Sequence, residues 1–213
     1  MGGNMRGVRS QTPEAGWPAK ATVPGHLASP PARRPRLLRG RLLVLDDHEN
    51  LCGGPDAPTA VSGVVWQALT QSLGVTANDS VILGLSGFGF KNLWPSLPVN
   101  QVQLLFGSGR DGADRAIIEA VDLDHTAQRY DSVAIASGDH IFAPLAWRLR
   151  DRGLLVCNVT VGGRGCSRAL TKACQCHVRL KLDLGDHDTL ARLAAIRATT
   201  HGYEGEWIGR HVR

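Results

Sequence analysis

The chain lacks a hydrophobic run long enough to cross a membrane. None of its 213 residues belongs to a stretch of eighteen or more apolar residues, whereas a membrane-spanning helix needs about 20. The first forty residues also lack the apolar segment of a secretory signal. Their Arg, Lys, Ser and Pro with few acids weakly suggest an organellar transit peptide, but the proline content argues against an amphipathic helix. The sequence predicts a cytoplasmic protein with no membrane segment.

Paired cysteines at metal-binding spacings are also missing. The five cysteines are an odd number and predict free thiols in a reducing compartment. Cys174, Cys176 and His177 could form half of a zinc site, but no second pair of ligands completes it. A structural zinc is therefore not favoured.

Two motifs for binding or transferring small phosphates are absent. Asp47 is followed two places later by Glu49, not by the aspartate of an Asp-x-Asp-x-Thr/Val nucleophile. No Gly-x-x-x-x-Gly-Lys-Ser/Thr loop occurs, and the glycines of 84–89 and 162–165 do not fit a dinucleotide fingerprint. A small-molecule phosphohydrolase is thus left without support.

A basic leader precedes the part of the chain with a regular apolar pattern. Residues 1–39 are rich in Pro and Gly and have no apolar period, which predicts disorder. The net charge of +5 suits a polyanion such as nucleic acid, although much of the excess lies in this leader. We expect one domain over 40–184 and a C-terminal helix and tail over 185–213.

Short apolar runs alternate with helical patterns through the expected domain. Strands that are apolar on both faces belong in the middle of a parallel sheet, and the alternation indicates an α/β class, Rossmann-like three-layer sandwich with a mainly parallel central sheet. Residues 87–100 are expected to be irregular, and Thr59 is expected to cap a helix. Strands are predicted at 42–45, 80–85, 102–106, 131–137, 154–159 and 177–182, and helices at 59–73, 113–128, 140–152, 167–174 and 186–199.

Three segments each deliver an aspartate to the same edge of the predicted sheet. Asp47 follows the first strand, Asp114 follows the third and Asp139 follows the fourth. Ligands of open parallel sheets bind beyond the carboxyl ends of the strands. Carboxylates that meet there repel each other unless a divalent cation lies between them. We therefore predict a Mg²⁺ or Mn²⁺ site, which could activate water for attack on a phosphodiester.

Each of these residues also has an interpretation without a metal. Asp47 and Asn50 could cap the turn after the first strand. Asp139 precedes a helix and could be its N-cap, and capping does not exclude metal binding. Asp114 lies in the first turn of its helix, where the dipole favours acids.

Other polar residues near the acids are assigned lesser roles. Asp46 should point away from Asp47 because neighbours on a strand face opposite sides, and it is placed behind the metal ligands. His48 and His140 could shuttle protons, but we interpret them as incidental loop residues. Asp122 and Asp124 are interpreted as solvated helix surface.

At these residues the sequence resembles the NYN domain family of the PIN-like nuclease superfamily. Residues 43–51, Leu-Val-Leu-Asp-Asp-His-Glu-Asn-Leu, resemble its opening strand and Asp-x-x-Asn signature. Residues 112–116, Gly-Ala-Asp-Arg-Ala, resemble its Gly-Val-Asp segment. Residues 131–145 resemble its strand ending in Ser-Gly-Asp-x-Asp-Phe-x-Pro-Leu. The resemblance spans about 41–184.

The resemblance implies a Mg²⁺- or Mn²⁺-dependent ribonuclease acting on RNA. It places the catalytic metal ligands on Asp47, Asp114 and Asp139. The remaining predicted site residues contact substrate or support the metal: Asn50 orients water or phosphate, Ser137 supports the metal ligands, and Arg110 holds the phosphate backbone together with the basic leader.

Two positions depart from the family pattern. Ile141 stands where the family usually has a second aspartate, and Ala120 stands where a further acid often follows. The alternative hypothesis is therefore a degenerate NYN domain that binds RNA or a protein partner without cleavage. The RNA target, protein partners and the oligomeric state, including a homodimer, stay open.

Overall fold

The computed structural model describes residues 38, 40–93, 97, 102–163 and 165–182, together with the backbone of 205–209. These residues build a seven-stranded sheet in the order β3-β2-β1-β4-β5-β6-β7. All pairings are parallel except that of β7 with β6. The predicted α/β sandwich with a mainly parallel sheet is therefore confirmed. The strands are β1 Leu42–Asp47, β2 Ser80–Ser86, β3 Gln103–Gly107, β4 Ser132–Ala136, β5 Leu155–Val161, β6 Cys176–Leu180 and β7 Gly205–Gly209.

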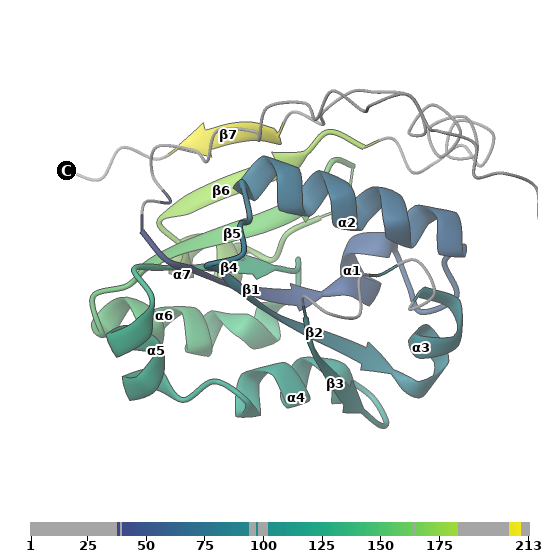
Figure 1. The fold of residues 1–213 in the computed structure, drawn as a ribbon, viewed down its shortest axis with the longest axis horizontal. Helices are drawn as coiled ribbons and strands as arrows, with labels where there is room; N and C mark the ends of the chain where they lie inside the picture. The colour runs from purple at the N-terminus through teal and green to yellow at the C-terminus, as the bar shows by residue number, and fades with distance from the viewer. Residues whose placement is uncertain are drawn as a thin grey trace, which may run out of the picture.

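Helices cover both faces of the sheet (Figure 1). Alternate residues of β1 pack on opposite sides, since Val44 belongs to one buried cluster and Leu45 to the other. One layer contains α1 (His48–Cys52), α2 (Thr59–Leu73) and α3 (Gly87–Leu93). The other contains α4 (Gly112–Glu119), α5 (Leu123–Arg129), α6 (Ala143–Asp151) and α7 (Arg168–Ala173). The apolar-on-both-faces pattern of the strands is thus explained by burial on two sides.

Strand β1 lies where the order of the sheet changes direction. The chain passes from β1 to β2 and β3 on one side, and then crosses to β4, β5 and β6 on the other. Such a switch point leaves a crevice at the carboxyl ends of the two central strands. The register pairs Asp46 with Ala136, which brings the end of β1 beside Ser137. The fold therefore places the predicted acids after β1 and β4 next to each other.

Two helices differ from their predicted extents for local reasons. The helix expected over 113–128 is two helices, because Asp122 interrupts it with extended backbone and caps α5 by accepting from the His125 N–H at 2.8 Å. Asp122 is therefore a capping residue and not only solvated surface. Residues 87–93, expected to be irregular, form α3 directly after β2. The helix was not predicted because glycine has a low helix propensity, and Gly87 and Gly89 both lie in this segment.

Two other helices begin differently from the prediction. Thr59 is not a cap: Pro58 occupies the N-cap position of α2, and the Thr59 hydroxyl donates to the Asn92 carbonyl at 2.6 Å. The helix expected from residue 140 begins as a single 3₁₀ turn, His140–Phe142, before α6.

The chain ends lie mostly outside the described residues. The predicted disordered leader, apart from Leu38, and the predicted helix at 186–199 both lie there. Within the expected C-terminal tail, β7 adds an unpredicted strand to the sheet. No helix in the described part of the chain is both long and apolar enough to cross a membrane. All five cysteines are free thiols.

Candidate metal centre

Asp47 ends β1 and is almost fully buried, with 4% of its surface exposed. One carboxylate oxygen accepts from the Asn50 N–H at 3.3 Å and so caps α1. The other accepts from the Ser137 hydroxyl at 2.7 Å. The capping role considered from sequence is therefore present, and the same carboxylate is tied to the end of β4.

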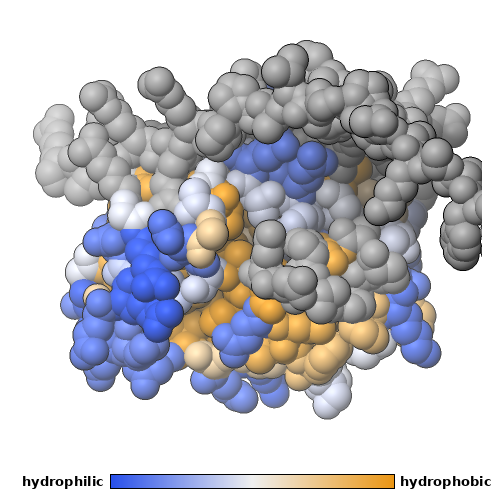
Figure 2. Space-filling view, viewed as in Figure 1, coloured by the Kyte–Doolittle hydropathy of each residue, from blue (hydrophilic) through white to orange (hydrophobic). Residues whose placement is uncertain are grey.

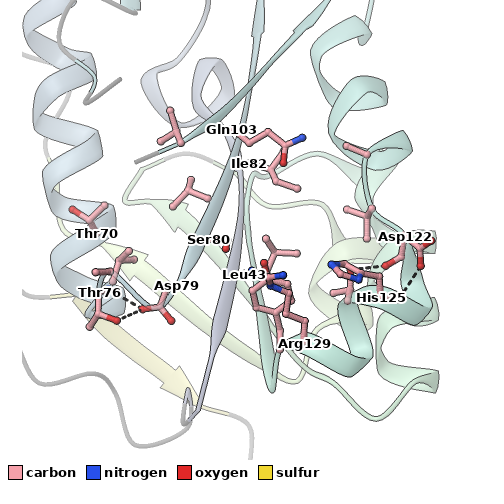
Figure 3. A pocket seen from close by; sticks show the side chains of 18 of the residues that line it. Leu43, Thr70, Thr76, Asp79, Ser80, Ile82, Gln103, Asp122, His125 and Arg129 are labelled. Carbon is pink, nitrogen blue, oxygen red and sulfur yellow. Dashed lines mark hydrogen bonds between the residues drawn. The ribbon is translucent and has the colours of Figure 1, made fainter. Parts of the chain in front are cut away.

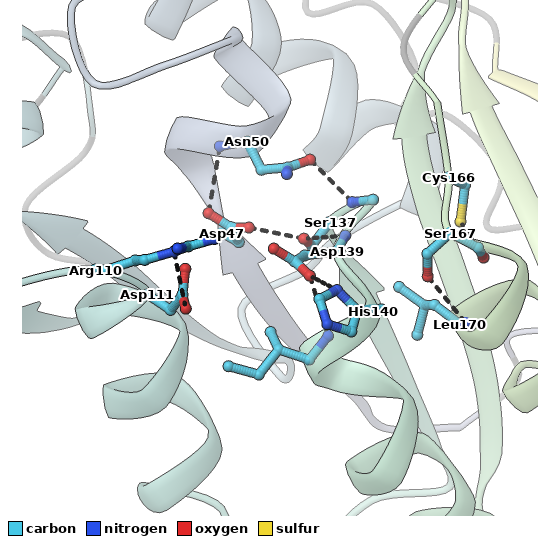
Figure 4. Close-up of polar contacts among 12 residues, drawn as sticks. Asp47, Asn50, Arg110, Asp111, Ser137, Asp139, His140, Cys166, Ser167 and Leu170 are labelled. Carbon is cyan, nitrogen blue, oxygen red and sulfur yellow. Dashed lines mark hydrogen bonds and ion pairs between the residues drawn. The ribbon is translucent and has the colours of Figure 1, made fainter.

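Asn50 and Ser137 hold the turn that follows β4 (Figure 4). The Asn50 side-chain oxygen accepts from the Gly138 N–H at 2.9 Å, and the Ser137 hydroxyl oxygen accepts from the Asp139 N–H at 3.1 Å. Together with the Ser137–Asp47 bond, these contacts fix the Asp139 backbone relative to Asp47. Contact of Asn50 with water or phosphate stays a prediction.

Asp139 is the N-cap of the 3₁₀ turn, as the sequence suggested. Its carboxylate accepts from the Ile141 N–H at 3.1 Å and lies 2.7 Å from the His140 ring nitrogen. The His140 side chain is 80% exposed, as expected of a loop histidine. The Asp139 carboxylate is only partly exposed and remains accessible to a ligand.

Three carboxylates converge at this edge of the sheet. Asp111, Asp114 and Asp139 each offer an oxygen, and these oxygens lie within 4.8 Å of one another. Asp111 was not assigned to the site from the sequence, because an acid at the end of a Gly-rich loop carries no periodic signal. Its backbone is left-handed, with φ of 55°, a conformation that aspartate tolerates better than most residues. We call Asp111, Asp114 and Asp139 the carboxylate triad.

Asp47 is not a member of the carboxylate triad, but its side chain is hydrogen-bonded to that of Asp114. Burial raises the pKa of Asp47 well above its usual range, and the neighbouring Asp114 charge raises it further. Burial also raises the pKa of Asp114, with added repulsion from Asp139 and Asp111. Crowded carboxylates of this kind need a proton or a cation between them. Because every donor is an oxygen, the residues fit a hard divalent cation such as Mg²⁺ or Mn²⁺.

An open cleft of about 410 Å³ lies against these acids. Asp47, Asp111 and Asp114 line it, together with Asn50 and Ser86. Arg110 is 96% exposed, and its guanidinium lies 3.9 Å from the Asp111 carboxylate. The cleft is therefore accessible from solvent and has an exposed cation beside it.

Comparison with known families adds an independent finding. Residues 88–181 match the NYN domain family. This match identifies residues 88–181 as an NYN domain. The matched segment includes the whole carboxylate triad, whereas Asp47 precedes it.

The other comparisons add little. A search of curated proteins gave no match. Among solved structures, a protein of unknown function from Vibrio parahaemolyticus is similar, with 18% identity and a TM-score of 0.43. The alignment covers 66% of this chain and 93% of that one.

The two departures from the NYN pattern have clear places in the structure. Ile141 is partly buried and packs against the cluster beneath α4 and α6. Ala120 is the C-cap of α4, with a backbone N–H bonded to Ala116. Neither residue offers a ligand atom. Asp111, from the loop before α4, supplies the third carboxylate of the triad instead.

A buried polar network lies behind Asp47. Asp46 faces the α2 layer and lies 3.0 Å from one His48 ring nitrogen, while the other ring nitrogen is 3.0 Å from the Ser62 hydroxyl. The Ser62 hydroxyl donates to the Leu93 carbonyl at 2.8 Å, so it accepts from His48. Asp46, His48 and Ser62 are fully buried. His48 is therefore a structural link between β1, α2 and α3, not an incidental loop residue.

A larger cavity of about 850 Å³ lies at the opposite end of the strands of the sheet (Figure 3). In the view of Figure 2, hydrophobic residues gather in the middle of the lower half of the molecule, and hydrophilic residues lie to the left and right of them. The acids that line the cavity already serve the fold: Asp79 accepts from Thr76 and Leu42, and Asp122 caps α5. Of the acids predicted from sequence, Asp47 and Asp114 line the smaller cleft at the other end of the strands and not this cavity.

Proposed function

We propose that this chain is an endoribonuclease that hydrolyses RNA phosphodiesters with Mg²⁺ or Mn²⁺. The observation that carries the proposal is the carboxylate triad, held at the switch point of an NYN domain. A cation held by Asp111, Asp114 and Asp139 would supply Lewis-acid chemistry and an activated water.

The chain's own residues are suited to hold the acids in place. Asp47 lies beside Asp114 and is fixed by Ser137 and Asn50. When the buried pair is ionised, it attracts a cation strongly because little water screens it. Arg110 is exposed at the cleft and can reach a substrate phosphate. The proposed site therefore contains the three predicted acids, Asp47, Asp114 and Asp139, and a fourth, Asp111.

A catalytically silent NYN domain that binds RNA is the second candidate. The observation favouring it is Ile141, which is packed into apolar surroundings and cannot serve as an acid. The triad forms without that position, so we place hydrolysis first. The two candidates differ in one outcome, which is whether bound RNA is cut.

The deciding experiment follows cleavage of a labelled mixed-sequence RNA with Mg²⁺, with Mn²⁺ and with EDTA. Purified wild type is compared with Asp114→Asn and Asp139→Asn. Asp124→Asn is the control, because Asp124 is an exposed acid that pairs with Arg152 and belongs to α5, a helix that lines the cavity at the opposite end of the strands. We expect metal-dependent cutting by wild type and the control, and a loss of at least a hundredfold in both triad variants. Binding without cutting by folded wild type would instead support the silent domain.

A further inference from the structure

The two helices that follow the carboxylate triad carry a strip of exposed cations. In the described helices α6 and α7, four residues are basic and only Asp151 is acidic. Arg168 and Lys172 are both exposed and four positions apart, so they lie on one side of α7. This surface therefore favours a polyanion.

An aromatic ring continues this basic strip. Trp147 of α6 is 45% exposed, unusual for so large an apolar side chain. The Arg150 guanidinium lies over its ring, 4.4 Å from the centroid, and donates to the Ala173 carbonyl at 3.0 Å. Arg150 thus fixes the ring beside the end of α7. Trp147, Arg150, Arg168 and Lys172 together are called the α6–α7 platform.

Hydrogen bonds connect the α6–α7 platform to the proposed active site. The Ser167 N–H donates to the Gly138 carbonyl at 2.9 Å, next to Asp139. Ser167 also caps α7, directly before Arg168. In Figure 4 Ser167 lies on one side of Asp139, and Arg110 and Asp111 lie on the other. An RNA strand that extended from the carboxylate triad toward Ser167 would reach Arg168, the first residue of α7.

We propose that the α6–α7 platform binds single-stranded RNA on one side of the bond to be cut. Arg168 and Lys172 contact successive phosphates, and a base stacks on the exposed face of Trp147. An exposed ring selects a single strand, because bases within a duplex are already stacked. This inference rests on the proposed function, since RNA is the substrate in both.

Binding is measured without cleavage, by fluorescence anisotropy of a labelled single-stranded RNA with full-length protein in EDTA. We expect Trp147→Ala to weaken binding about tenfold, the usual loss for one stacked base. Trp147→Phe should restore most of it, because it keeps a ring. The double variant Arg168→Gln, Lys172→Gln should lower the slope of log affinity against log salt by about 1.4, or 0.7 for each lost contact.

The matched control is Arg129→Gln, an exposed arginine of α5 beside the cavity at the opposite end of the strands. Affinities of the platform variants equal to those of wild type and Arg129→Gln would overturn the platform, as would failure of folded wild type to bind RNA. An RNA duplex bound as tightly as the single-stranded RNA would overturn the selectivity for a single strand.

The same variants separate this inference from the proposed function. Platform-dependent binding by a wild type that cuts nothing with either metal would keep the platform and remove the nuclease. Metal-dependent cutting that is unchanged in the platform variants would keep the nuclease and remove the platform.

Discussion

At the scale of single residues, the paired carboxyls of Asp47 and Asp114 give a pH dependence of stability. Their pKa values are raised above the ordinary 3.8, mainly by burial. An acid whose pKa is higher in the folded state stabilises the fold most below its unfolded pKa. That contribution is lost as pH rises through the folded pKa. In EDTA, lowering the pH from neutral toward 4 should therefore raise the melting temperature of wild type more than that of Asp114→Asn. Identical pH profiles for the two proteins would contradict this.

The buried link through His48 gives a second prediction at this scale. Burial lowers the pKa of His48, but its interactions with neighbouring groups, above all the Asp46 charge, outweigh burial, so the pKa is raised. His48 donates to both Asp46 and Ser62, which fits a charged ring. Asp46→Asn leaves that charge unpaired and should lower the free energy of unfolding by about 3 kcal/mol. Ser62→Ala should cost about 1 kcal/mol. Urea unfolding measures both, and equal small losses would refute the ion pair.

At the scale of elements, the turn after β4 sets how closely α7 approaches the site. A Cβ on Gly138 would lie 2.5 Å from the Gly165 carbonyl oxygen, a backbone atom that cannot easily move. Gly138→Ala should therefore displace the start of α7 and reduce cleavage at least tenfold. Gly87→Ala is the control, because a Cβ there meets nothing within 4 Å. Comparable activity in the two variants would contradict this, because it would show that the turn accommodates a Cβ without a change at the site. Cleavage rates and melting temperatures are compared together.

The same scale shows what the sequence could and could not predict. The apolar runs predicted all six strands of the parallel part, and strand ends predicted that Asp114 and Asp139 would converge. The split between α4 and α5 was missed, because the capping preference of Asp122 competes with a continuous apolar period. Asp111 and the partner of His48 were missed for another reason. A loop's path and a contact between β1 and α2 depend on tertiary packing, which no local pattern encodes.

At the scale of the whole molecule, metal binding and folding should be coupled. A cation that binds only the folded triad stabilises the protein by about 2.7 kcal/mol at a hundred times its dissociation constant. We expect Mn²⁺ to raise the wild-type melting temperature at neutral pH and to leave Asp114→Asn nearly unchanged. Calcium-free buffer and Asp124→Asn serve as references. An equal rise in wild type and Asp114→Asn would place the ion elsewhere.

The central position of β1 has a consequence for synthesis. Asp47 and its partner Ser137 are 90 residues apart in the chain. At roughly 5–20 residues per second, the ribosome needs about 5 to 20 seconds to make that interval. Throughout this time one edge of β1, a strand that is buried along its whole length, has no partner because β4 has not yet been made. A nascent chain that ends before Asp139 holds only part of the carboxylate triad, so the complete triad cannot form until β4 and the turn after it have been synthesised.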